Sequence, residues 1–192
     1  MDARELAPAL WYWTAPHPSW RPGADWPEAV GCVYYEAPDA AVLIDPLLPR
    51  GEEEEFLRHL DRDVERLGRP VVILLTAPWH RRSTAELAER YGAVVAPEEL
   101  PEGVESIAIG GSDEAQLAFF IRPHRALVVA EIFMGDGSGG LVVCPSPALI
   151  DRAALDKSLR DLLALPVERV LVSHGEPVLS DGGRAIAAAL SS

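Results

Sequence analysis

The sequence is poor in cysteine and in positive charge, and each shortage excludes a class of protein. The only two cysteines, Cys32 and Cys144, lie far apart in apolar, strand-like surroundings. Their spacing fits no zinc site, so we expect two buried free thiols rather than a disulfide. Lysine and arginine total 17 against 30 acidic residues, which gives a formal net charge of −13. Binding to nucleic acid or to an anionic membrane is therefore not expected, because both require clustered positive charge.

Long apolar runs and targeting signals are also missing. No stretch approaches the roughly 20 apolar residues that span a bilayer. The N-terminus lacks the basic start and apolar core of a signal peptide. The glycine-rich segment 135–140 has neither the lysine nor the strand-to-helix setting of a phosphate-binding loop. We therefore expect a cytoplasmic globular protein, and the length predicts a single domain over residues 1–192.

Short β-type runs come first in the chain and are then mixed with helices. The predicted strands are 10–13, 30–35, 41–44, 71–75, 93–96, 105–109, 116–121, 126–132, 141–144 and 169–172. Apolar residues at helical spacing predict helices over 52–67, from Ser83 onward, over 151–165 and over 184–190. Ser83 and Glu86 have the spacing of a capping box at the start of the second helix. This order indicates an α/β (α+β) protein.

Four polar residues fall near the ends of predicted strands, namely Asp45, His80, Glu131 and His174. Ligands of layered α/β proteins bind at such ends. Each residue also has an ordinary structural explanation. Asp45 could form a turn and His80 could cap a helix, while Glu131 could face solvent and His174 could bond within its own loop. Their shared placement makes them candidate catalytic or binding residues.

The segment Pro70–Leu87, PVVILLTAPWHRRSTAEL, resembles the metal-binding loop of the metallo-β-lactamase superfamily. In that family a buried strand leads into the pattern T-H-x-H-x-D-H and then into a helix. Thr76 and the second histidine, His80, are retained here. The resemblance extends over nearly the whole chain and implies the family's fold. That fold is a four-layer αββα sandwich of two mixed sheets covered by helices on their outer faces.

Several of the family's metal ligands are replaced in this sequence. Pro78 and Ser112 stand where the resemblance places histidines of the first metal site. Arg82 and Ser83 stand where it places an aspartate and a histidine of the second. A guanidinium remains charged at any working pH and would repel a divalent cation a few ångströms away. The resemblance therefore implies a two-zinc site that has been lost.

Other positions of the family's site keep a suitable residue. Asp45 matches the aspartate that supports the metal loop, Glu131 takes the place of the bridging aspartate, and His174 matches the last histidine. Arg82 could pair with Glu131 and with Asp45 and so replace the zinc ions as the organiser of the pocket.

Three functions remain open. The favoured one is a hydrolase-like protein with no cofactor that binds a small molecule in the residual pocket. The alternative is a hydrolase of an ester, thioester or related bond. It would hold one divalent zinc, manganese or iron ion through His80, Glu131 and His174. Those ligands come from different halves of a two-metal site. The third is a purely structural protein, such as a homo-oligomer component.

One long loop, over residues 14–27, is rich in proline and tryptophan and contains His17. The favoured interpretation is an aromatic cover packed over the core. The other is a lid whose indoles bind a planar or apolar ligand.

Overall fold

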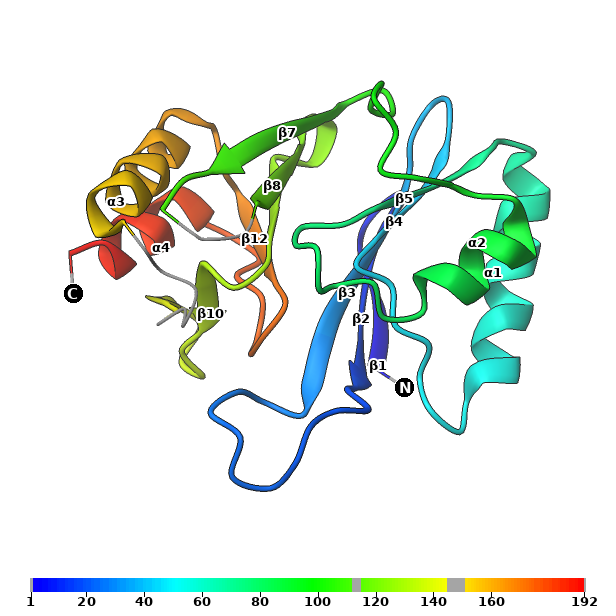
Figure 1. The fold of residues 1–192 in the computed structure, drawn as a ribbon. Coiled ribbons are helices and arrows are strands. Elements are labelled where there is room, and N and C mark those ends of the chain that lie inside the picture. The colour runs from blue at the N-terminus through cyan, green and yellow to red at the C-terminus, as the bar shows by residue number, and fades with distance from the viewer. Residues whose placement is uncertain (1, 112–114, 145–150, 192) are drawn as a thin grey trace. The chain divides into compact units, whose positions relative to one another are not determined.

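The computed structural model describes residues 2–111, 115–144 and 151–191. These residues belong to two compact units, and each unit has its own sheet and helices (Figure 1). The first unit comprises Met1–Leu75 and Trp79–Gly103, and the second comprises Thr76–Pro78 and Val104–Ser192. The single domain expected over residues 1–192 stays a prediction.

The sheet of the first unit has six strands in the order β1-β2-β3-β4-β5-β6. These strands are β1 (Asp2–Ala7), β2 (Leu10–Pro16), β3 (Ala29–Glu36), β4 (Ala41–Ile44), β5 (Val71–Leu74) and β6 (Val94–Val95). The pairing is antiparallel from β1 to β4 and parallel from β4 to β6. β1 was not predicted, because its sequence DARELA contains few typical strand residues.

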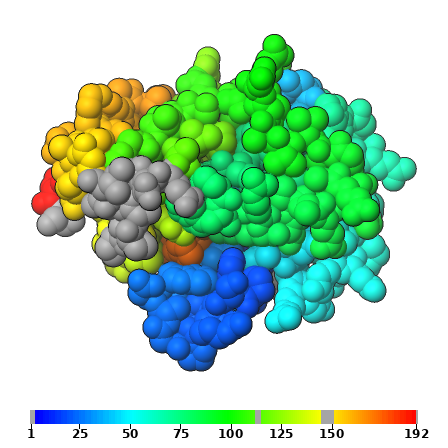
Figure 2. Space-filling model, in the orientation of Figure 1, coloured from blue at the N-terminus to red at the C-terminus, as the bar shows by residue number. Residues whose placement is uncertain are grey.

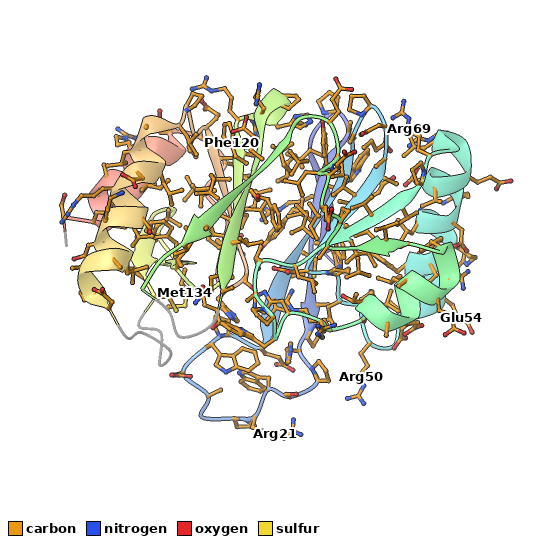
Figure 3. All side chains as sticks on the ribbon, turned by 45° about the horizontal axis from the view of Figure 1, so that its top comes forward. Arg21, Arg50, Glu54, Arg69, Phe120 and Met134 are labelled. Carbon is orange, nitrogen blue, oxygen red and sulfur yellow. The ribbon has the colours of Figure 1, made fainter. Side chains whose placement is uncertain are left out.

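Helices α1 (Glu53–Leu67) and α2 (Thr84–Tyr91) lie on the same side of this sheet (Figure 1). α1 buries Phe56 and Leu60 against a cluster that includes Trp13 and Ile73. Glu54 lies in its first turn, where the helix dipole favours negative charge (Figure 3). The helix ends at Leu67, as predicted, and is followed by Gly68, whose left-handed conformation suits a residue without a Cβ atom.

The second unit contains a four-stranded sheet in the order β12-β9-β8-β7, together with the separate hairpin β10-β11. The strands are β7 (Val104–Ile109), β8 (Gln116–Ile121), β9 (Ala126–Val129), β10 (Phe133–Gly135), β11 (Leu141–Val143) and β12 (Arg169–Val172). The predicted strand over 126–132 is too long, because β9 ends at Val129 and β10 starts at Phe133. β10 was not predicted.

Helices α3 (Arg152–Asp161) and α4 (Gly182–Ala189) pack against the core of the second unit through Leu155, Leu159 and Ile186. Asp151 caps α3 by accepting a hydrogen bond from the main chain of Ala154. The helix predicted over 151–165 changes to a single 3₁₀ turn, η2 (Leu162–Ala164), after Asp161. A second such turn, η1 (Arg122–His124), joins β8 to β9. Within the described part of the chain, no helix has both the length and the apolar character to cross a membrane.

Candidate functional site

Parallel pairing of β4 with β5 brings Asp45 and His80 together. In the register of these strands Ile44 lies opposite Leu74, so the chain leaves both strands at the same edge of the sheet. Asp45 follows β4 directly, and the loop over residues 75–83 follows β5 and carries His80. The Nδ1 atom of His80 lies 2.9 Å from Oδ2 of Asp45, and both side chains are buried.

This contact determines which ring nitrogen of His80 carries hydrogen. An ionised carboxylate only accepts hydrogen bonds, so the imidazole donates to it from Nδ1. In the neutral ring Nε2 is then the acceptor. An imidazole oriented by a carboxylate in this way suits two roles, that of a general base and that of a metal ligand.

Arg82 also holds Asp45 in place, through its main chain. Its Nη1 atom donates to the main-chain carbonyl of Asp45 at 2.8 Å and to that of Gly31 at 2.9 Å, and it lies 3.6 Å from Sγ of Cys32. Arg82 thus contacts Asp45 at its main-chain carbonyl, and the expected pairing of its charge with the Asp45 carboxylate stays a prediction. The expected pairing with Glu131, which belongs to the second unit, stays a prediction.

The capping box predicted at Ser83 and Glu86 is wrong. The Ser83 side chain makes no capping bond to α2. Its hydroxyl instead accepts a hydrogen bond from the main chain of Leu48 at 3.0 Å. The main-chain N–H of Ser83 donates to the carbonyl of Pro46. Tertiary contact with the segment over 45–48 has displaced the local cap.

Trp13 was not predicted as part of this site, and its indole Nε1 donates to the carbonyl of Leu47 at 2.9 Å. Trp13 is almost fully buried, and a buried indole N–H requires an acceptor. That requirement was the available signal, although it does not identify the acceptor. Side chains from β2 and from the loop after β5 therefore hold the segment that contains Asp45.

The two cysteines differ in environment, although both are free as expected. Cys32 is buried beside Arg82, whereas Cys144 is only partly buried, so the expectation of burial is confirmed for Cys32 alone. Burial raises the pKa of the Cys32 thiol to about 11, although the positive charge of Arg82 acts in the opposite direction.

This difference predicts selective thiol labelling. At pH 8 the reagent DTNB is expected to modify Cys144 first and Cys32 only slowly. This pH lies far below the raised pKa of the buried Cys32 thiol, so the thiol stays protonated and little reactive thiolate forms. Mass spectrometry of peptides from partly labelled protein measures the order. Denatured protein, in which both thiols should react together, is the control. Faster labelling of Cys32 in native protein would contradict its burial.

Parallel pairing also brings together the two candidates of the second unit. Val129 of β9 lies opposite Val172 of β12, so Glu131 and His174 both follow the same edge of that sheet. Nε2 of His174 lies 3.7 Å from Oε1 of Glu131, which is longer than a direct hydrogen bond. His174 is buried, while about a quarter of the Glu131 side chain (26%) is exposed.

Close backbone packing fixes the main chain around His174. The carbonyl of His174 accepts a hydrogen bond from the N–H of Gly135 at 3.0 Å. A Cβ atom on Gly135 would lie 2.3 Å from the carbonyl oxygen of Glu176, and one on Gly175 would lie 2.7 Å from that of Gly135. Only residues without a side chain permit β10 to approach the His174 turn this closely.

The tryptophan-rich loop is braced by contacts within itself. Trp20 donates from its indole to the carbonyl of Trp26, and the His17 ring meets Trp26 edge to face at 5.2 Å. Trp26 also packs against the core of the first unit. Arg21 lies at the outer end of this loop, which is blue in Figures 2 and 3. These contacts agree with an aromatic cover, and binding of a ligand by the indoles stays a prediction.

The remaining predicted metal positions supply few donors. The side chain of Pro78 has no donor atom for a metal, and Ser112 lies outside the described residues. Over residues 2–111, 115–144 and 151–191, no group of three histidine, cysteine, aspartate or glutamate side chains is placed to hold a metal ion.

Comparison with known proteins gives a fold. No family model and no curated protein sequence matches the chain. Among solved structures, a metallo beta lactamase from Erythrobacter litoralis aligns with a TM-score of 0.67 and 14% identity over 98% of this chain and 90% of that one. The chain has the metallo-β-lactamase fold. The predicted fold class, the αββα sandwich, is thereby confirmed.

Two further structures with the metallo-β-lactamase fold align over nearly the whole of both chains. A metallo-beta-lactamase from Pontibacter korlensis has a TM-score of 0.61 and 17% identity over 99% of this chain and 97% of that one. A metallo beta lactamase from Hirschia baltica has a TM-score of 0.60 and 14% identity over 98% and 97%. At such identities the likeness establishes the fold and leaves the activity open.

Proposed function

We propose that this chain is a hydrolase-like protein of the metallo-β-lactamase fold that has lost the two-zinc site and binds a small molecule through the loop after β5. The observation that carries the proposal is the guanidinium of Arg82. By the resemblance, Arg82 stands at a metal-ligand position of the family. Its guanidinium donates to the carbonyl of Asp45 at 2.8 Å. A fixed cation there opposes the binding of a second cation.

The other side chains of this loop support the same conclusion. The side chain of Pro78 has no donor atom for a metal, and the Ser83 hydroxyl accepts a hydrogen bond from the main chain of Leu48. Of the family's ligands in this loop, His80 is the one that remains. The residues present therefore do not fit two metal ions.

The residues that the loop retains support small-molecule binding. His80 is held by Asp45 with Nε2 as its acceptor nitrogen, and a ligand with an N–H or O–H group suits it. The family's hydrolysis depends on metal-bound water, which two lost metal ions would not supply. Binding without zinc chemistry is therefore the function that these residues favour.

A second candidate is a hydrolase of an ester, thioester or related bond that uses one metal ion held by some of His80, Glu131 and His174. The Asp45–His80 contact favours it, because histidine ligands of metals usually donate their other N–H to a carboxylate. A zinc, manganese or iron ion would supply an activated water there.

Metal content distinguishes the two candidates. Untagged protein, purified with and without added zinc, manganese and iron, is expected to contain only background metal by elemental mass spectrometry. His80→Ala and His174→Ala variants are expected to give the same background. Near-stoichiometric metal that disappears in both variants would refute the proposal. It would establish the second candidate and justify a screen of esters and thioesters.

A further inference from the structure

Arg82 connects three segments of the first unit that are distant in sequence. It belongs to the loop after β5, and its guanidinium donates to Gly31 on β3 and to the carbonyl of Asp45 after β4. The same nitrogen approaches the thiol of Cys32. One side chain thus holds together the strand ends on either side of the Asp45–His80 contact.

The backbone conformations of Asp45 and Arg82 are ones that depend on support from surrounding contacts. Asp45 has a φ angle of 49° and Arg82 one of 35°, both in the left-handed region that residues with a Cβ atom rarely adopt. Asp45 also precedes Pro46, and a proline disfavours helical backbone angles in the residue before it. Such conformations persist when the surrounding contacts over-determine them.

We propose that Arg82 is a positioning residue that does the structural work of a metal ion, holding Asp45 so that its carboxylate orients His80. This inference rests on the proposed function and assigns a role within the same site. A bound metal organises a site by drawing ligands from separate segments onto one positive charge. Arg82 does the same from within the chain, with carbonyl oxygens and a thiol as its partners. The orientation of His80 therefore does not depend on metal.

Arginine suits this role better than lysine. Its planar guanidinium holds the two N–H groups of Nη1 in a fixed geometry, and these donate to the carbonyls of Gly31 and Asp45. The ammonium of lysine is a compact charge on a flexible stem, so it keeps the charge without the geometry. The Arg82→Lys variant therefore separates charge from placement. The neighbouring Arg81 is exposed and provides a matched control for the loss of one positive charge from the same loop.

The experiment reads the His80 ring and the Cys32 thiol in wild type and in Arg82→Met, Arg82→Lys and Arg81→Met variants. All four carry Cys144→Ser, so that DTNB reports Cys32 alone. The ¹⁵N chemical shifts of labelled histidine, at one fixed pH, report which ring nitrogen carries hydrogen. A His80→Gln spectrum assigns the signal among the five histidines. Circular dichroism confirms that each variant is folded.

Wild type and Arg81→Met are expected to show one His80 tautomer, with hydrogen on Nδ1, and slow labelling of Cys32. Arg82→Met is expected to show a mixture of tautomers. It is also expected to label Cys32 about tenfold faster, because loss of the charge-assisted hydrogen bonds to Gly31 and Asp45 makes local opening around Cys32 easier. This gain outweighs the loss of the Arg82 charge, which lowers the pKa of the Cys32 thiol. Arg82→Lys should lie between these results. A general loss of stability would speed the labelling without changing the tautomer in the folded protein.

Wild-type tautomer and labelling rate in Arg82→Met would overturn the inference. Should that variant not fold, wild-type values in Arg82→Lys would overturn it equally. Exhaustive treatment of wild type with EDTA tests the proposed function separately. If the tautomer is lost on chelation and restored by zinc, a metal organises the site and the proposed function fails. The Arg82 variants then still decide the positioning role.

Discussion

The variant His80→Ala is expected to lower the free energy of unfolding by about 3–5 kcal/mol, as measured by urea denaturation. The imidazole is buried and lies 2.9 Å from the buried Asp45 carboxylate. Its removal deprives that carboxylate of a partner and leaves a cavity in its place. A buried charge that loses its partner is among the few causes of so large an effect from one substitution.

A second substitution tests this explanation. Asp45→Asn removes the charge but keeps the shape of the side chain, and asparagine tolerates the left-handed conformation at this position. The double variant His80→Ala/Asp45→Asn is therefore expected to be more stable than His80→Ala alone by about 1–2 kcal/mol. His59→Ala, at an exposed position of α1, should change stability by less than about 0.5 kcal/mol. If the double variant were less stable than the single one, the charge would not be the cause.

The variant Gly135→Ala is expected to lower the free energy of unfolding by about 3 kcal/mol. The added methyl group would lie 2.3 Å from the carbonyl oxygen and 2.5 Å from the main-chain nitrogen of Glu176. Both are backbone atoms, so relief requires β10 to move away from the turn that carries His174. The hydrogen bond from Gly135 to the carbonyl of His174 would be weakened by the same movement.

Gly183→Ala is the matched control for this substitution. Gly183 lies in α4, where a Cβ atom would meet the carbonyl of Val167 at 3.6 Å, an ordinary contact. Alanine costs less backbone entropy in a helix, so this variant is expected to be more stable by about 0.5 kcal/mol. Thermal and urea denaturation of the two variants measure the contrast. Equal stability of both would contradict the close packing of β10 on the His174 turn.

The elements that the sequence predicted well are those in which local pattern and tertiary packing agree. α1 has its apolar residues on one face, acidic residues in its first turn and Gly68 after its last residue. The apolar run of β5 is buried, as a strand covered on both faces should be. Elements whose local sequence is not typical were missed. β1 is a strand because β2 supplies its hydrogen-bond partners, which composition does not report.

The candidate site was predictable as a set of residues and not as an arrangement. The resemblance drew attention to Asp45, His80 and Arg82, and the structure places all three in contact through the end of β4. Nothing in their spacing gives that result, since residues 45 and 80 lie 35 positions apart. The parallel pairing of β4 with β5 decides it. Ser83 shows the limit of local rules, because its hydroxyl left the predicted cap for Leu48.

By itself, the sequence determined the class of fold, the positions of most helices and strands, and the absence of several family ligands from their expected positions. The class of fold and the elements follow from local periodicity together with the family resemblance, and the absent ligands follow from residue identity at the positions that the resemblance assigns. The tertiary structure alone decided that Asp45 orients His80, that Arg82 donates hydrogen bonds to main-chain carbonyls, and that Gly135 packs on the turn of His174. Such contacts join segments that are remote in sequence. They depend on strand register and close packing, which no local pattern specifies.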